Sequence, residues 1–90
     1  MDFEWDDAKA AVNRRKHGVS FDEAATAFDD PLVSIFHDEA HSVFEDRWLA
    51  IGISDRGRLI VVSHGYRGGR TRIISARKAT ANEVREYAER

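Results

Sequence analysis

A run of strand-like segments occupies residues 32–77 of this chain, and no helical pattern interrupts it. Each segment alternates apolar with polar residues or is contiguously apolar, as strands are. The segments are residues 32–36, 47–54, 59–64 and 70–77. A polar loop follows the first, and short glycine-containing turns join the other three. Because turns this short connect antiparallel neighbours, the sequence predicts an antiparallel sheet.

Two helices are expected before these strands. Asp6 stands where it would cap a helix over residues 7–17. Ser20 and Glu23 have the spacing of a capping box, which opens a second helix. That helix must end before Pro31, because the residue preceding a proline is pushed out of the helical conformation. The helical part of the chain therefore lies mainly ahead of the sheet.

A short strand over residues 3–5 opens the chain, and a helix from the capping box of Thr80 and Glu83 to about Tyr87 closes it. The expected order is β-α-α-β-β-β-β-α. Helices followed by a run of hairpin-linked strands indicate an α+β fold. We expect a single domain over residues 1–90, with one twisted antiparallel sheet and the helices packed on one face.

Charge is distributed unevenly, although the net charge is only −2. Residues 1–46 hold twelve acids and four bases, which gives −8. Residues 47–90 hold ten bases and four acids, which gives +6. Such asymmetry points to contact with a polyanion. It is equally explained if the two halves pack together and partly neutralise each other, and the charges alone leave both explanations open.

Several classes of protein are disfavoured by composition. The chain has no cysteine, which excludes disulfides, thiolate metal sites and cysteine nucleophiles. Its first residues do not resemble a signal peptide, and its apolar runs are far shorter than a membrane span. No glycine-rich phosphate loop opens a helix. We therefore expect a cytoplasmic protein without a membrane segment or cofactor.

Arginine dominates the basic half of the chain. Seven arginines lie on the last three expected strands or their turns: Arg47, Arg56, Arg58, Arg67, Arg70, Arg72 and Arg77. A guanidinium forks onto two phosphate oxygens and stays charged at every physiological pH. Charges along a sheet edge also guard it against aggregation. This structural explanation is favoured for Arg56, Arg58 and Arg67 beside turns, whereas Arg72 and Arg77 bracket apolar residues and are the better phosphate-binding candidates.

Lys16 and His17 stand at the expected end of the first helix, directly before Gly18. A histidine there could transfer protons near neutral pH, and a lysine could stabilise developing negative charge. Cations that complement the helix dipole explain both residues as well. The residues alone favour this capping explanation.

Other candidate residues have simple structural explanations. His64 ends the central strand, Glu83 is the capping partner of Thr80, and Tyr87 would pack on the sheet. His37 and His41 do not form the zinc motif H-E-x-x-H, because Asp38 follows His37 and the segment reads as a loop. We expect no metal site there.

Taken together, the chain resembles the BrnT toxin family over nearly its whole length. The matching residues are 3–6, Lys9, Asn13, 16–21, Glu23, Ala24, Asp30, Pro31, Arg47, Gly57, Arg58, 72–77, Glu83 and Tyr87. Each piece is weak alone, but the ordered set is specific.

The resemblance implies a RelE-like fold and a ribonuclease toxin that cleaves messenger RNA and arrests growth. It implies a BrnA-like antitoxin as partner, which contacts operator DNA through a ribbon-helix-helix part. Ribonucleases of this kind use the 2′-hydroxyl of the RNA as nucleophile and need no metal. The resemblance favours Lys16, His17, Arg72 and Arg77 as catalytic residues. RNA-binding candidates around them are Arg58, His64, Arg67, Arg70 and Tyr87.

Two other classes stay open. ParE-like relatives share the fold that the resemblance implies, but they poison DNA gyrase and do not cut RNA. A module that binds protein or DNA without any toxicity is the third possibility. Cleavage of cellular RNA after brief expression would distinguish the first class from the other two.

Overall fold

A computed structural model describes residues 1–89. Its elements follow the expected order, with two short 3-10 helices added. They are β1 (Phe3–Glu4), α1 (Asp7–His17), α2 (Phe21–Thr26), η1 (Ala27–Asp29), β2 (Ser34–His37), η2 (Glu39–His41), β3 (Trp48–Ile53), β4 (Leu59–Arg67), β5 (Arg70–Lys78) and α3 (Ala81–Ala88). The α+β class expected from the sequence is confirmed.

The strands form one five-stranded sheet in the order β1-β5-β4-β3-β2 within residues 1–89. Strands β2 to β5 pair antiparallel, as their short connections predict. The expectation of a wholly antiparallel sheet is wrong at one edge, where β1 pairs parallel with β5 through Phe3 opposite Thr71. Hairpin turns fix the direction only of the strands they join, and β1 is separated from β5 by most of the chain.

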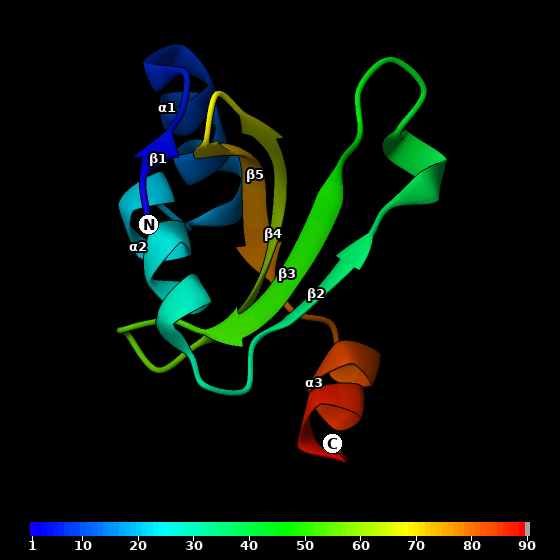
Figure 1. The fold of residues 1–90 in the computed structure, drawn as a ribbon. Coiled ribbons are helices and arrows are strands. Elements are labelled where there is room, and N and C mark those ends of the chain that lie inside the picture. Colours follow the sequence, from blue (N-terminus) through cyan, green and yellow to red (C-terminus); the bar gives the residue numbers. More distant parts are fainter. Residues whose placement is uncertain (90) are drawn as a thin grey trace.

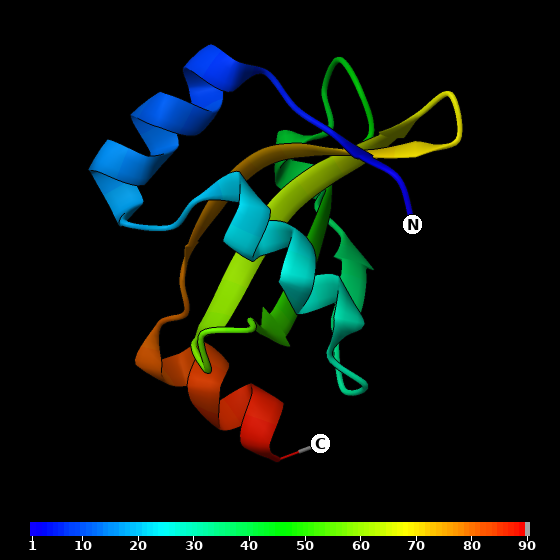
Figure 2. The same cartoon turned by 90° about the vertical axis from the view of Figure 1, so that its left-hand side faces the viewer.

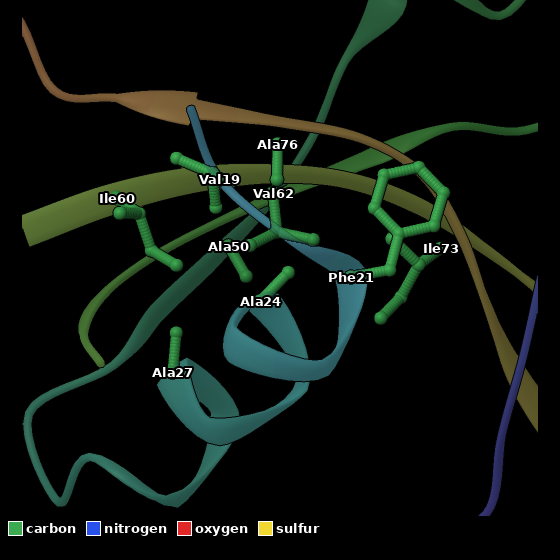
Figure 3. Packing of buried hydrophobic residues seen from close by; sticks show 9 residues of the cluster. All are labelled: Val19, Phe21, Ala24, Ala27, Ala50, Ile60, Val62, Ile73 and Ala76. Carbon is green, nitrogen blue, oxygen red and sulfur yellow. The ribbon is translucent and has the colours of Figure 1, made fainter. Parts of the chain in front are cut away.

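The main core lies between α2 and one face of the sheet. Small and apolar side chains of α2 and the segments around it point at the strands (Figure 3). The cluster consists of Val19, Phe21, Ala24, Ala27, Ala50, Ile60, Val62, Ile73 and Ala76. Alanines on the helix side allow α2 to approach the sheet closely, and the buried apolar area stabilises this packing.

Helix α3 lies apart from α1 and α2, at the far end of the sheet (Figures 1 and 2). Its residues Glu83 and Tyr87 line a small pocket with Phe36 and Ile51. Ile51 is the strand neighbour of core residue Ala50 and so points to the opposite face of the sheet. The expectation that all helices pack on one face is therefore wrong for α3, whereas α2 packs on the core face and α1 lies along the edge of β5. The reason is an anchor on that other face, the ion pair of Arg77 with Glu83.

Asn13 joins α1 to the outer edge of β5. Its side-chain amide donates to the carbonyls of Val19 and Ala76, both at 2.9 Å. Its side-chain oxygen accepts from the backbone N–H of Ala76 at 3.1 Å. One buried side chain thus satisfies strand groups that β1 does not reach, as buried polar groups require. None of the helices in residues 1–89 has the length and apolarity to cross a lipid bilayer.

Candidate active site

The face of the sheet opposite α2 is only partly covered between the β4–β5 hairpin and α3, and we call it the open face. It is defined by Ser63, Gly65, Arg72 and Ser75, which are paired across β4 and β5 as Ser63 with Ser75 and Gly65 with Arg72. A β-bulge between these pairs leaves Ile74 as an extra residue on β5. Bulges of this kind redirect side chains and are frequent beside active sites.

A cavity with a volume of about 390 Å³ lies at the hairpin end of this face. Basic, acidic and aromatic residues share its wall. The lining residues are Glu45, Asp46, Trp48, Gly65, Tyr66, Arg67, Arg72 and Ile74. Glycine at position 65 permits a close approach here, because a Cβ there would lie only 3.3 Å from the backbone oxygen of Asp46. The loop before β3 therefore closes tightly over β4 and forms one wall of the cavity.

A second cavity of about 370 Å³ lies between α1 and β5. Lys16 and His17 line it together with Ile74 and Ser75. Ile74 belongs to both cavities, so the two adjoin along β5. The structure therefore brings the helix-end pair and Arg72 to one continuous surface, although 54 residues lie between His17 and Arg72 in the sequence.

Lys16 and His17 occupy the last turn of α1, as the sequence predicts. Gly18 follows with a φ of 70°, and its backbone N–H donates to Arg14 in the C-terminal cap. The cationic side chains complement the negative end of the helix dipole there. The same two residues thus stabilise the helix end and line the cavity.

The side chain of Arg72 makes no hydrogen bond or ion pair within residues 1–89, and the residue is half-buried in the cavity wall. Its charge contributes to lowering the pKa values of Glu4 and Asp6, behind larger contributions from hydrogen bonds to Arg67 and the Lys9 backbone. A guanidinium with its donors free is suited to an incoming anion.

Arg77, the other arginine favoured by the sequence, is engaged in a different way. Both of its terminal nitrogens donate to the carboxylate of Glu83, at 2.8 and 3.0 Å. This hydrogen-bonded pair lowers the pKa of Glu83 to about 2 and raises the pKa of Arg77. The guanidinium fork is therefore occupied by α3, at the border of the open face.

Arg58 and Arg67 also hold carboxylates. The Nε of Arg58 donates to Glu23 at 2.9 Å, and this hydrogen bond is the main cause of the lowered pKa of Glu23. Arg67 donates to Glu4 at 2.8 Å. Both pairs join the acidic first half to the basic second half, so mutual neutralisation explains part of the charge asymmetry. The structural role of Arg58 is thus an ion pair with a buried carboxylate rather than a solvated charge that guards the sheet edge.

His64 faces the core and has no exposed surface. Because a carbonyl can only accept, its Nδ1–H donates to Val62 at 3.2 Å, and its Nε2 accepts from the Tyr66 hydroxyl at 3.1 Å. Burial lowers the pKa of His64 and keeps the ring neutral. A fully buried ring offers no surface to RNA.

The remaining candidates are dispersed. Tyr87 donates its hydroxyl to Asp30 and thereby ties α3 to the segment before β2. Arg70 lies exposed at the tip of the β4–β5 hairpin. His37 and His41 contact different carboxylates, Asp46 at 3.1 Å and Asp38 at 2.9 Å. Within residues 1–89 no group of three potential metal ligands occurs.

Sequence reasoning missed two parts of this surface. Glu45 and Asp46 belong to a polar loop that carries no signal of a cavity wall. The aromatic pair Trp48 and Tyr66, with ring centroids 6.1 Å apart, lies on different strands. To predict their contact from the sequence, one would have needed the cross-strand register, which places both residues near the β4–β5 hairpin.

Comparisons with known proteins agree with this architecture. A profile described as the ribonuclease toxin BrnT of type II toxin–antitoxin systems matches residues 5–83. The crystal structure of the Brucella abortus ribonuclease toxin BrnT is similar, with a TM-score of 0.70 and 28% sequence identity. That similarity covers 89% of this chain and 97% of the Brucella chain. A comparison with curated protein sequences finds no match. Since the profile spans most of the sequence, the chain belongs to the BrnT family of ribonuclease toxins of type II toxin–antitoxin systems.

Proposed function

We propose that this chain cleaves RNA on the open face, without a metal ion, by attack of a 2′-hydroxyl on the adjacent phosphate. One observation carries the proposal. Arg72, with its donors free, and the helix-end pair Lys16 and His17 line two cavities that adjoin at Ile74. A phosphate ligand and proton-transfer groups are the parts that such a reaction needs.

The proposed reaction forms a bond from O2′ to phosphorus and breaks the bond from phosphorus to O5′. A base removes the 2′-hydroxyl proton, and an acid protonates the leaving O5′. We assign Lys16 and His17 to these proton transfers. Arg72 stabilises the extra negative charge on the phosphate oxygens with a forked pair of hydrogen bonds.

Arg77 borders the same face, but its fork is held by Glu83. We therefore assign it a secondary part in phosphate binding, together with exposed Arg70. Arg67 lines the cavity and is paired with Glu4, so it contributes to the positive field there rather than a free fork.

We further propose that the antitoxin is BrnA-like and that the toxin reaches operator DNA only through it. Messenger RNA in the cytoplasm is the proposed substrate. The resemblance of the sequence to BrnT toxins supports these assignments.

The test uses purified protein and short RNA oligonucleotides. Cleavage should continue in excess EDTA and yield 2′,3′-cyclic phosphate ends. Replacing the 2′-hydroxyl by hydrogen at the mapped cleavage position should abolish cleavage there. Cleavage of the deoxy-substituted oligonucleotide, or its loss with EDTA, would contradict the mechanism. Gyrase-linked DNA breaks with intact RNA would instead indicate a ParE-like activity.

A further inference from the structure

The outer edge of the sheet at β2 has an unusual surface. Strand β2 is the last in the sheet order and pairs only with β3. Figure 1 shows no helix or strand of residues 1–89 alongside its outer side. Large apolar side chains on β2 and the loop after it are exposed. They are Ile35 at 43%, Phe36 at 44%, Val43 at 78% and Phe44 at 100%.

The opposite edge of the sheet is protected. Strand β1 pairs with part of β5, and Asn13 satisfies the backbone of Ala76 beyond it. Native proteins guard exposed edges with lysine, proline, bulges or a covering element. Strand β2 is short but carries no lysine, proline or bulge, since its four residues are Ser, Ile, Phe and His and its pairing with β3 has no register shift. An edge left open in this way is suited to a partner.

The backbone of β2 offers hydrogen bonds to such a partner. The backbone N–H of Asp38 donates to the backbone carbonyl of Arg47 at 2.9 Å. The backbone groups of Asp38 therefore point toward the segment that leads into β3. Inward and outward residues alternate along an antiparallel edge. The register then places the backbone groups of Ile35 and His37 on the outer side. An added strand would take up both.

Charge around this edge defines the chemistry of the partner. Residues 29–46, which comprise β2 and its flanking segments, hold six carboxylates and neither lysine nor arginine. RNA would be repelled from this surface, whereas a basic peptide would be attracted. The edge is also separated from Arg72 by β3 and β4, so it is distinct from the open face.

We propose that the antitoxin docks here, by adding an extended segment to β2 as a sixth strand of the sheet. The added segment alternates apolar residues, which pack against Ile35 on one face of the sheet, with lysine or arginine on the other face, whose aliphatic stems lie along Phe36 and whose charges face carboxylates such as Glu86. Main-chain hydrogen bonds supply affinity in this mode, and the side-chain alternation supplies specificity. This inference rests on the antitoxin partnership of the family and not on the proposed cleavage mechanism.

Amide hydrogen exchange tests the docking site directly. The 15N-labelled toxin is compared free and in complex with the antitoxin of the same operon. The amides of Ile35 and His37 should exchange at least tenfold more slowly in the complex. A complex that forms with unchanged exchange at both amides overturns the proposal. Protection that is already present in the free toxin and grows with its concentration also overturns it, because a second copy then covers the edge.

Ile35→Pro provides the matching variant. Proline is tolerated on an edge where the N–H faces outward, and it removes that donor. The variant should retain the melting temperature of the parent within a few degrees and bind antitoxin at least tenfold more weakly by calorimetry. Val12→Lys, at an apolar position 52% exposed on α1, is the control and should bind as the parent does. Equal antitoxin affinity of folded Ile35→Pro and the parent contradicts the proposal, whatever the RNA cleavage assay shows.

Discussion

Lys16 and His17 show how one pair of residues satisfies two requirements. They end α1 beside Gly18, where their charges suit the helix dipole, and they line the cavity next to Ser75. A capping role and a catalytic role predict different effects when either side chain is removed. Removing a cation from a helix C-terminus costs about 0.3–1 kcal/mol of stability. Removing a general acid or base lowers the rate by roughly 10²–10⁴-fold.

We therefore predict that Lys16→Ala and His17→Ala remain folded and are strongly impaired in RNA cleavage. Melting temperature and cleavage rate are measured on the same purified variants. Arg15→Ala is the control, because it removes a charge from the same last turn without lining the cavity. If both variants cleave within a few-fold of the parent, the pair is only a helix cap.

The pair of Arg58 with Glu23 leads to a prediction about stability rather than activity. The Glu23 side chain is only 4% exposed, and it also accepts from Ser54 at 2.7 Å. Truncating one partner leaves a buried charge unpaired, which costs about 3–5 kcal/mol in buried sites. Arg58→Ala should therefore lower the free energy of unfolding by about 2–3 kcal/mol, since Arg58 is partly exposed.

Urea titration of Arg58→Ala, Glu23→Ala and the double variant measures this coupling. The double variant should be less destabilised than the sum of the single variants, because no orphaned charge remains. Additive effects would show that the two residues act independently.

At the scale of elements, α3 depends on a few polar contacts with the rest of the molecule. Arg77 and Glu83 join it to β5, and Tyr87 joins it to Asp30. The Arg77 guanidinium lowers the pKa of Glu83 from 4.5 to about 2. A carboxylate whose folded pKa is depressed stabilises the fold above its unfolded pKa. This contribution is lost as pH falls through the folded pKa.

The free energy of unfolding should accordingly decrease as pH falls from about 4.5 to about 2. The share due to Glu83 is about 1–2 kcal/mol, a value reduced for the partial exposure of Arg77. Denaturation at a series of pH values, on the parent and on Glu83→Gln, isolates this share. A Glu83→Gln variant with the same slope as the parent would contradict the assignment.

On the scale of the whole molecule, patterns local in sequence predict well what local physics determines. The capping residues Asp6, Ser20 and Thr80 each accept the expected backbone N–H, and the strands β2 to β5 follow their turns. The parallel pairing of β1 depends on contacts between distant residues. The place of α3 depends on the ion pair of Arg77 with Glu83 and on the hydrogen bond of Tyr87 to Asp30, which no helix or strand pattern indicates.

The candidate site, like the fold, could be predicted from the sequence only in part. The sequence indicates which residue types suit RNA chemistry, but it does not show which arginines are already paired. Arg58, Arg67 and Arg77 hold carboxylates, whereas Arg72 holds none among residues 1–89. His64 has a suitable side chain for catalysis but a buried position. Pairing and burial depend on the folded arrangement of strands, so they lie beyond sequence reasoning.

The central claim is that RNA is cleaved on the open face with Arg72 on the phosphate. It is tested most directly by the cleavage rates of Arg72→Ala and Arg56→Ala, both checked for folding by melting temperature. Arg56 is an exposed arginine in the turn between β3 and β4 and does not line the cavity. Arg72→Ala should cleave roughly 10²–10³-fold more slowly, as expected when a donor to a developing anion is lost. Arg72→Lys should recover little, because a lysine lacks the planar fork. Arg56→Ala should cleave as the parent does. A folded Arg72→Ala that cleaves RNA at the rate of Arg56→Ala would contradict the account.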